Sequence, residues 1–419
     1  IPACPISAPC WPQWRGRGSI RSWEYRVATA FKMPEPDHPA ARPLRVALFS
    51  GNYNYVRDGA NQALNRLVAF LERQGCTVRV YSPTSDTPAF EPAGTLISVP
   101  SLSIPGRAEY RVALGLPDRL KRDVADFAPG IIHLSAPDPL GHAAKKLGRK
   151  LGVPVVASVH TRFETYLEYY GLGFLRPAGE GVLRRFYAGL DEVFATTPGF
   201  AETLRQQRIV ETAAIWSRGV DKARFNPGRR SPEWRWSLGI ADDEPVIAFV
   251  GRLVLEKGLD KVAATVAELQ RRGVKHRLLV VGDGPARERF AAQVPDAIFA
   301  GFLDGNNLPR AYASAEVLIN PSITETFGNI NLEAMACGIP VVAADASGNS
   351  SLVTDGVTGR LVPHDDIGAY ADALALYLGN PAARAAAGAA GLAAAQAYDW
   401  DEINGAVLAR YQALVAARG

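Results

Sequence analysis

The chain has 419 residues, of which 47% are hydrophobic and 21% charged, as in folded globular proteins. This length favours two domains over a single core. The net charge of +4, from 46 basic and 42 acidic residues, is too mild to indicate a nucleic-acid partner by itself but suits small phosphate ligands. No apolar run approaches the roughly 18 residues that cross a bilayer. The four cysteines lack the spacing of a zinc site or disulfide framework, so we expect a reducing cytoplasm.

Residues 1–42 are expected to form a disordered N-terminal extension. Arginines outnumber acids in its first part, and the first methionine is Met33. A transit-peptide-like segment is one alternative, although no apolar core of a secretory signal is present. Translation from upstream of a true start at Met33 is the other.

From Leu44 onward, short apolar runs of strand length alternate with helix-like segments such as Asn61–Arg73. The first runs are Leu44–Ser50, Thr77–Tyr81, Ile131–Leu134, Val155–His160 and Glu192–Thr196. The alternation pauses across Trp216–Trp236. It then resumes with Val246–Val250, Arg277–Val281, Ile298–Ala300, Glu316–Asn320 and Pro340–Ala344. Apolar strands alternating with amphipathic helices predict parallel sheets covered on both faces. We therefore predict an α/β protein with two doubly wound domains, joined near residues 218–243.

The segment Pro321–Gly338 follows a predicted strand and runs into a helix, where ligands of open parallel sheets bind. Its amides near Gly328–Ile330 are unpaired donors of a helix start and suit a diphosphate. Glu325 in the loop and Glu333 in the helix would repel phosphate, so we expect them to accept from sugar and ribose hydroxyls. The alternative is that Glu333 complements the helix dipole and Glu325 is a solvated loop acid.

The segment Val250–Gly258 also leaves a predicted strand and enters a helix. Arg252 can grip phosphate oxygens through its planar fork, and Lys257 can do so as a point charge. Both would stabilise the charge on a departing nucleoside diphosphate, and losing one contact would slow the reaction by about two to three decades. The alternative is a pair of surface cations.

Three weaker signals complete the predicted site. Gly282 and Asp283 begin a partial dinucleotide fingerprint in which Arg287 replaces the third glycine. Gly59 follows the first strand and would let the backbone approach a donor. His160 ends a predicted strand on the same side, although a lone histidine there is more often a packing residue.

No metal or cofactor is predicted. The one Asp-x-Asp sequence is Asp399-Trp400-Asp401, where Asp399 suits the N-cap of the last helix better than a ligand for Mg²⁺.

The spacing Gly251-Arg252…Lys257, Gly282-Asp283-Gly284 and Glu325-x7-Glu333 resembles the second domain of retaining glycosyltransferases of family four. The resemblance implies the GT-B fold, with two Rossmann-like domains facing a central cleft. It implies residues 43–218 as the acceptor domain, residues 219–398 as the donor domain, and 399–419 as a helix crossing back. The catalytic residues would be Glu325, His160, Arg252 and Lys257. The donor-binding residues would be Gly59, Arg252, Lys257, Gly282, Asp283, Phe327, Gly328, Asn329, Glu325 and Glu333.

The segment His160–Gly171 is similar to lipid-directed mannosyl- and sulfoquinovosyltransferases of that family. It implies transfer of mannose from GDP-mannose to a lipid or glycan acceptor, with an α-linkage. A UDP-hexose-dependent glucosyl- or sulfoquinovosyltransferase, a GT-B nucleotide-sugar epimerase and a silent nucleotide-sugar binding module are the alternatives. Two departures from the family pattern are Asp58-Gly59, in place of paired glycines, and Ser351, where an acid is frequent.

Basic and aromatic residues in the first half suggest an anionic membrane surface as a second partner. Lys145, Lys146, Arg149 and Lys150 form a basic helical segment, and residues 162–187 mix aromatic side chains with arginines. Such mixtures suit docking on anionic lipid, so we expect a peripheral enzyme on the inner face of the cell membrane. A solvated helix face with aromatic residues in the core explains the pattern equally well.

Overall fold

The computed structural model describes residues 43–56, 58–104, 107–160, 174 and 176–418. The chain from Pro43 onward forms one compact unit. The predicted extension, residues 1–42, and most of the aromatic segment, residues 161–173, lie outside the described residues.

Within the described residues, the first lobe is built on a seven-stranded parallel sheet in the order β3-β2-β1-β6-β7-β8-β9. Its strands are β1 (Arg45–Phe49), β2 (Thr77–Ser82), β3 (Thr95–Ser98), β6 (Ile131–Leu134), β7 (Val155–Val159), β8 (Glu192–Ala195) and β9 (Ala214–Ile215). Its helices are α1 (Gly59–Arg73), α2 (Asp118–Phe127), α3 (Pro139–Leu151), α5 (Arg176–Tyr187) and α6 (Pro198–Gln206). Separate hydrophobic cores cover the two faces of the sheet.

The second lobe is built on a six-stranded parallel sheet in the order β12-β11-β10-β13-β14-β15, again among the described residues. Its strands are β10 (Val246–Val250), β11 (Arg277–Val281), β12 (Ile298–Gly301), β13 (Val317–Asn320), β14 (Val341–Ala344) and β15 (Gly359–Val362). Its helices are η2 (Pro227–Arg229), α7 (Pro232–Ser237), η3 (Leu255–Lys257), α8 (Leu259–Arg271), α9 (Arg287–Gln293), α10 (Asn307–Ala313), α11 (Asn329–Ala336), α12 (Ser347–Ser350), α13 (Ile367–Gly379) and α14 (Pro381–Ala395). Two cores again cover its faces, so the predicted pair of doubly wound sheets is confirmed.

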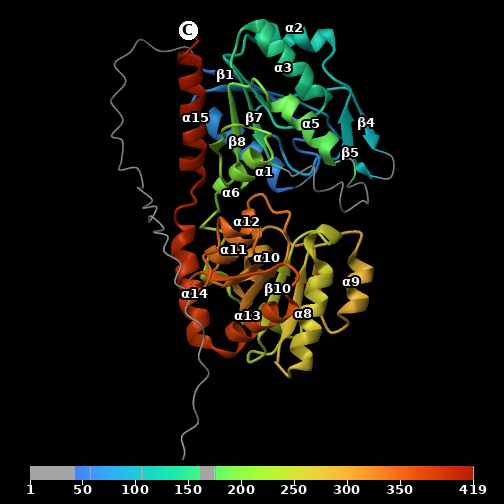
Figure 1. Ribbon diagram of the computed structural model, residues 1–419, viewed down its shortest axis with the longest axis vertical. Coiled ribbons are helices and arrows are strands. Elements are labelled where there is room, and N and C mark those ends of the chain that lie inside the picture. The colour runs from blue at the N-terminus through green and yellow to red at the C-terminus, as the bar shows by residue number, and fades with distance from the viewer. Residues whose placement is uncertain (1–42, 57, 105–106, 161–173, 175, 419) are drawn as a thin grey trace, which may run out of the picture. The chain divides into compact units, whose positions relative to one another are not determined.

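The last helix, α15 (Trp400–Ala416), packs on α1 of the first lobe (Figure 1). Its Val407 and Tyr411 are fully buried in the core that contains β1. The carboxylate of Asp399 accepts from the backbone N of Asp401 at 2.8 Å, which confirms the predicted N-cap. The second lobe is therefore bracketed in sequence by segments that belong to the first.

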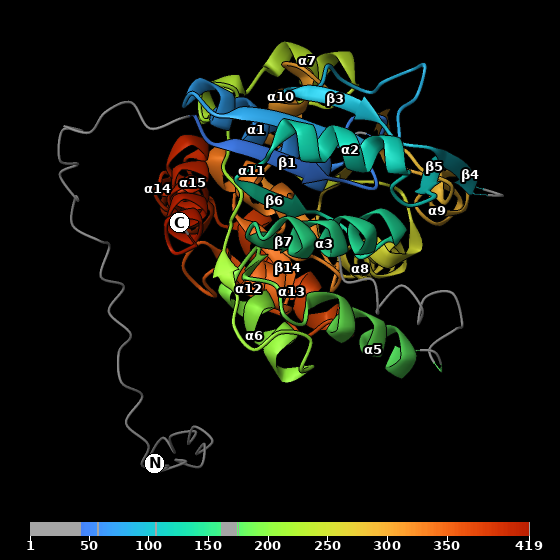
Figure 2. The same cartoon turned by 90° about the horizontal axis from the view of Figure 1, so that it is seen from above.

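The prediction from sequence does not include an antiparallel hairpin in the first lobe. This hairpin is formed by β4 (Ser101–Ile104) and β5 (Arg107–Ala113) and is seen beside α2 in Figure 2. Leu102 pairs with Val112, and both side chains are exposed. Both strands alternate polar and apolar residues, Ser-Leu-Ser-Ile in β4 and Arg-Ala-Glu-Tyr-Arg-Val in β5, which is the pattern of a half-buried strand. The prediction rested on continuous apolar runs and did not include these two strands.

The basic segment of α3 divides into two kinds of residue. Lys145 is buried, and its Nζ donates to the backbone oxygens of Phe186 at 2.5 Å and Ala188 at 2.8 Å. Arg149 donates to the backbone oxygen of Gly189 at 3.2 Å. These two cations satisfy carbonyls at the end of α5, where a helix leaves its last C=O groups without partners. Lys145 is therefore not the solvated cation that the sequence suggested, whereas Arg149 stays exposed.

Replacing Lys145 by methionine should lower the stability of the protein. The variant keeps the length of the side chain but leaves buried carbonyls without a donor, at a cost of about 1–3 kcal/mol. Lys146→Met is the matched control, because Lys146 is exposed and its loss should change stability by less than about 0.5 kcal/mol. Thermal unfolding of both variants compares them directly, and equal melting temperatures would refute this role of Lys145.

Candidate functional site

The donor loop, which we define as residues 321–328, connects the end of β13 to the start of α11. Its last residue, Gly328, has a φ of +90° and precedes α11 without any side-chain cap. The first amides of a helix have no partner within it, so those at Gly328 and Asn329 lie where a diphosphate was predicted. A Cβ at position 328 would lie 2.9 Å from Nδ2 of Asn331. Both the backbone angle and the available space therefore require glycine.

Three fully buried asparagines hold the donor loop in place. Asn320 donates to Oδ1 of Asn331 at 2.9 Å and to Oδ1 of Asn349 at 3.1 Å, and Asn331 donates to the same Asn349 oxygen at 2.9 Å. Asn349 in turn donates to the backbone oxygen of Ser322 at 2.9 Å. Leaving one such buried group without a partner costs about 1–3 kcal/mol. The network thus ties the end of β13, the start of the loop and α11 to α12.

Lys257 and Glu325 form an ion pair beside the start of α11. Nζ of Lys257 lies 2.5 Å from Oε1 of Glu325, with side-chain exposures of 27% and 14%. Gly258, with φ of +70°, packs against Pro321, since a Cβ there would lie 3.0 Å from the proline ring. The structure therefore brings the loop after β10 into contact with the donor loop, and each partner of the ion pair is available to a ligand.

The partial dinucleotide fingerprint packs against the loop that carries Arg252. A Cβ at Gly282 would lie 1.9 Å from the backbone oxygen of Gly251, and the amide of Leu253 donates to the oxygen of Asp283 at 2.9 Å. Close backbone packing is sufficient reason for the glycine. The roles of Gly282 and Asp283 in donor binding stay predictions.

Glu333 lies on α11, half-buried beside the fully buried Tyr312. Its Oε2 accepts from the hydroxyl of Tyr312 at 2.9 Å. Burial raises the pKa of Glu333 to about 7, although Tyr312, Arg224 and Arg66 favour the ionised form. Burial is also the main reason for the raised pKa of Tyr312, followed by Glu333 and, more weakly, Glu325. The two predicted acids therefore share one neighbourhood, on either side of the start of α11.

The donor loop is also the part of the second lobe that contacts the first. Oγ1 of Thr196, directly after β8, donates to the backbone oxygen of Thr326 at 2.5 Å. Oγ1 of Thr326 donates to the backbone oxygen of His160 at 2.9 Å. At the start of α1, a Cβ on Gly59 would lie 2.4 Å from Nδ2 of Asn329. Gly59 thus lies beside the start of α11 and His160 beside the donor loop, and their roles in donor binding stay predictions.

Arg252 is exposed, and its charge acts on the Asp58 carboxylate of the first lobe. Asp58 caps α1 by accepting from the backbone N of Asn61 at 2.8 Å. Burial raises the pKa of Asp58, while the amides that it caps and the charges of Arg252 and Arg218 oppose that shift. Sequence reasoning missed Arg218 and Thr326, because both stand in segments interpreted as linker or loop.

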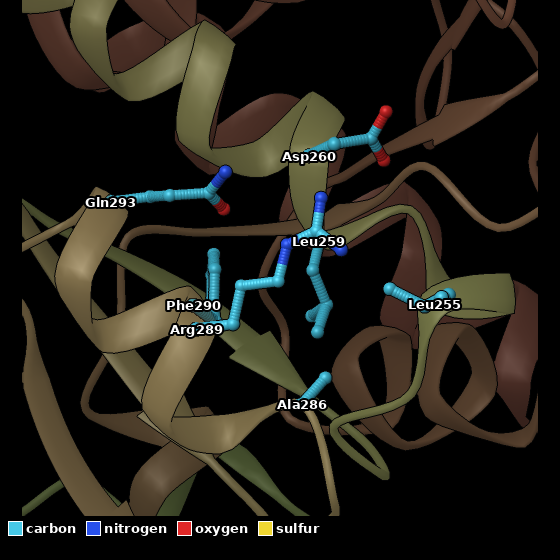
Figure 3. A pocket seen from close by; sticks show the side chains of 7 residues that line it. All are labelled: Leu255, Leu259, Asp260, Ala286, Arg289, Phe290 and Gln293. Atoms are coloured by element: carbon cyan, nitrogen blue, oxygen red, sulfur yellow. The ribbon is translucent and has the colours of Figure 1, made fainter.

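A cavity of about 270 Å³ in the second lobe lies apart from these residues (Figure 3). Its lining comes from the start of α8, from α9 and from the segments just before these helices, and comprises Leu255, Leu259, Asp260, Ala286, Arg289, Phe290 and Gln293. It contains no predicted site residue. Within the described ranges, no group of three or more His, Cys, Asp or Glu side chains is arranged to hold a metal, and metal independence stays a prediction.

Replacing Glu333 by glutamine should stabilise the ligand-free protein at alkaline pH. Its folded-state pKa of about 7 exceeds the ordinary glutamate value of about 4.3. Between these values the folded state keeps a proton that the unfolded state releases, so the wild type loses stability as pH rises from about 4.3 to about 7. Glutamine cannot ionise and avoids this loss, which is about 3–4 kcal/mol at most.

Melting temperatures of wild type and Glu333→Gln at about pH 5 and about pH 8 test this linkage. The variant should gain on the wild type at the higher pH. A difference that stays constant between the two pH values would show that the pKa of Glu333 is not raised.

Comparison with known proteins identifies the family. The family model described as Glycosyl transferases group 1 matches residues 230–393, and the one described as Glycosyltransferase Family 4 matches residues 57–224. A GDP-mannose-dependent alpha-mannosyltransferase of Mycolicibacterium smegmatis is 32% identical, over 90% of this chain and 99% of its own length. The sulfoquinovosyl transferase SQD2 of Arabidopsis thaliana is 30% identical, over 86% of this chain and 72% of its own.

Solved structures of other glycosyltransferases share the fold. A sucrose-phosphate synthase of Thermosynechococcus elongatus superposes with a TM-score of 0.74 at 22% identity, over 89% of this chain and 100% of that one. The two parallel-sheet lobes are the GT-B arrangement. Since both lobes match the family and full-length relatives exceed 30% identity, this chain belongs to glycosyltransferase family four and is an enzyme that transfers a hexose from a nucleotide sugar.

Proposed function

We propose that the enzyme transfers mannose from GDP-mannose to a lipid or glycolipid acceptor, with retention and without a metal. The observation that carries this proposal is the Lys257–Glu325 pair at the start of α11. A half-buried pair holds two opposite charges that a bound donor can use separately. The diphosphate binds Lys257, Arg252 and the first amides of α11, and the sugar hydroxyls donate hydrogen bonds to Glu325. The 32% identity to a GDP-mannose-dependent enzyme supports mannose as the sugar.

The proposed reaction proceeds on one face of the sugar. The acceptor hydroxyl oxygen forms the new bond to the anomeric carbon as the bond from that carbon to the diphosphate oxygen breaks. The departing phosphate oxygen takes the hydroxyl proton, so atoms and charge balance. The cationic side chains and the helix amides act where negative charge develops, and such fixed groups contribute most in the transition state.

Glu333 is proposed to hold the ribose. It lies one turn into α11, and in the described part of the chain its carboxylate accepts one side-chain hydrogen bond, from Tyr312 to Oε2. A carboxylate can accept several hydrogen bonds, so Oε1 is left to accept from a ribose diol. The charges of Arg224 and Arg66 favour the ionised form of Glu333 that this contact uses.

Lys257→Ala should lower turnover by about two to three decades, because it removes a cation that stabilises the departing diphosphate. Lys261→Ala is the matched control one turn further along: its Nζ bonds Asp365 at 2.7 Å, outside the proposed site. Release of GDP from GDP-mannose in the presence of a lipid acceptor measures both. Equal activity in the two variants would contradict the proposed role of Lys257.

Donor identity is tested alongside. Thermal stabilisation by GDP-mannose should exceed that by UDP-glucose or UDP-sulfoquinovose at equal concentration, since a ligand at about 100 times its Kd stabilises the folded state by about 2.7 kcal/mol. If a UDP-sugar stabilises the protein and GDP-mannose does not, the proposed donor GDP-mannose is wrong.

We further propose that the first lobe docks on an anionic membrane surface to reach its acceptor. No helix in the described part of the chain has the length and apolar character to cross a membrane. Lys146 and Lys150 remain exposed on α3, and the paired Leu102 and Val112 of the hairpin are 63% and 41% exposed. Phe186 and Tyr187 are buried and take no part. Exposed cations together with apolar side chains support shallow docking.

Reversing two of these charges, in Lys146→Glu with Lys150→Glu, should abolish binding to vesicles that contain anionic lipid. Each basic residue near such a surface contributes about 1 kcal/mol. Arg271→Glu with Lys275→Glu, on the second lobe, makes an equal change of charge and should leave binding intact. Vesicle flotation at low salt measures both, and failure of the wild type to float would remove the membrane proposal.

A further inference from the structure

A continuous chain of hydrogen bonds runs from the predicted site through the first sheet to the last helix. Nδ1 of His160 lies 2.6 Å from Nη2 of Arg218, and Nε2 of His160 lies 2.7 Å from Oγ of Ser158 in β7. The same Ser158 oxygen lies 2.8 Å from Nε2 of His133 in β6. Nδ1 of His133 then bonds the hydroxyl of Tyr411 in α15. Apart from partly buried His160, these side chains are at most 4% exposed.

Arg218 is held in place independently of His160. Its guanidinium lies 5.1 Å from the centre of the Trp216 ring, and Nη1 donates to the backbone oxygen of Ser217 at 3.3 Å. The Trp216 indole donates to Asn404 of α15 at 3.2 Å. Burial lowers the pKa of Arg218 to about 10, while Asp58 opposes that shift. Arg218 is therefore a charged, preorganised donor at neutral pH.

The partners of His160 determine where its proton lies. A guanidinium has donors and no acceptor, so Nδ1 of His160 must accept and carries no proton. The ring proton is then on Nε2 and is donated to Ser158. Burial, followed by the charges of Arg218 and His133, holds the pKa of His160 well below its usual range. Both ring nitrogens are engaged, and the ring is neutral.

We propose that Arg218 is a positioning residue that fixes His160 as the Nε2–H tautomer and keeps its ring uncharged beside the donor loop. The inference rests on the proposed donor site, because His160 matters to the reaction through its place next to Thr326, to which it is bonded. Glycosyl transfer develops positive charge at the anomeric carbon. An imidazolium there would oppose that charge, whereas Asp58 lies close enough to offset the charge of Arg218.

Side-chain NMR of the full chain labelled with ¹⁵N-histidine tests the tautomer without any need for activity. The chain has 6 histidines, and loss of one signal set in His160→Gln assigns His160. In the wild type, Nδ1 of His160 should show the chemical shift of an unprotonated nitrogen, and Nε2 that of a protonated one. Both shifts should stay constant from about pH 5.5 to about pH 8, a range in which an ordinary histidine titrates near about pH 6.5.

Two substitutions at Arg218 distinguish the effect of its hydrogen-bond donors and charge from the effect of its side-chain size. Arg218→Met removes both, so the His160 signals should shift with pH or average between tautomers. Arg218→Lys keeps a charged donor and should keep the wild-type pattern. Arg149→Met is the control, since Arg149 is another first-lobe guanidinium that donates to backbone oxygens, and it should change nothing. A wild-type pattern in Arg218→Met would overturn the proposal.

Kinetics provide the second measurement. The ratio of wild-type to Arg218→Met turnover should grow on acidification, by up to about tenfold per pH unit as His160 gains its proton, while Arg218→Lys stays within about threefold of wild type. A merely structural role would lower turnover equally at every pH, and that result would overturn the proposal. If Arg218→Met does not fold, Arg218→Gln, which keeps a neutral donor, should show the same growth on acidification. Absence of turnover with GDP-mannose in the wild type would count against the proposed donor and leave the NMR comparison intact.

Discussion

The contact between the donor loop and the ends of β7 and β8 is the interaction on which the candidate site depends. Thr326 accepts from Thr196 and donates to the backbone oxygen of His160. One residue of the second lobe is thereby bonded to two neighbouring strands of the first. Parallel sheets present all their carboxyl ends at one edge, so the joining of two such edges brings residues that are distant in sequence into one place. Every predicted role of His160 and Gly59 requires this contact.

Buried amides, rather than buried charges, hold that loop in place. Asn320, Asn331 and Asn349 satisfy one another and the backbone at the start of the loop. Neutral amides give directional bonds without the large desolvation cost of ions. The charged groups lie nearer the surface, as in the Lys257–Glu325 pair. The asparagine network therefore keeps the start of the loop rigid, while a ligand can rearrange the charged pair nearer the surface.

The last helix, α15, also supports the position of His160, through hydrogen bonds to the first lobe. Tyr411 ends a chain of hydrogen bonds that begins at Arg218, and Asn404 of the same helix receives the Trp216 indole. Arg218 stands in the segment that leaves the first lobe, so α15 supports that crossing directly. The position of His160 thus depends on a residue about 250 positions further along the chain, because the buried polar groups between them must all find partners.

Periodicity was enough to predict the two parallel sheets, and the spacing of a few loop residues carried the resemblance to the family. The strand runs, the glycines and the spacing of Arg252, Lys257, Glu325 and Glu333 are local properties, and local sequence determines local backbone. The β4–β5 hairpin was not predicted because its short strands alternate polar and apolar residues and contain no continuous apolar run. Only the tertiary structure showed that Lys145 caps α5, that Lys257 bonds Glu325, and that Nδ1 of His160 faces the guanidinium of Arg218. Each of these observations is a contact between segments that lie far apart in the sequence. Such contacts depend on the geometry of the folded chain, and residue spacing in the sequence does not predict them.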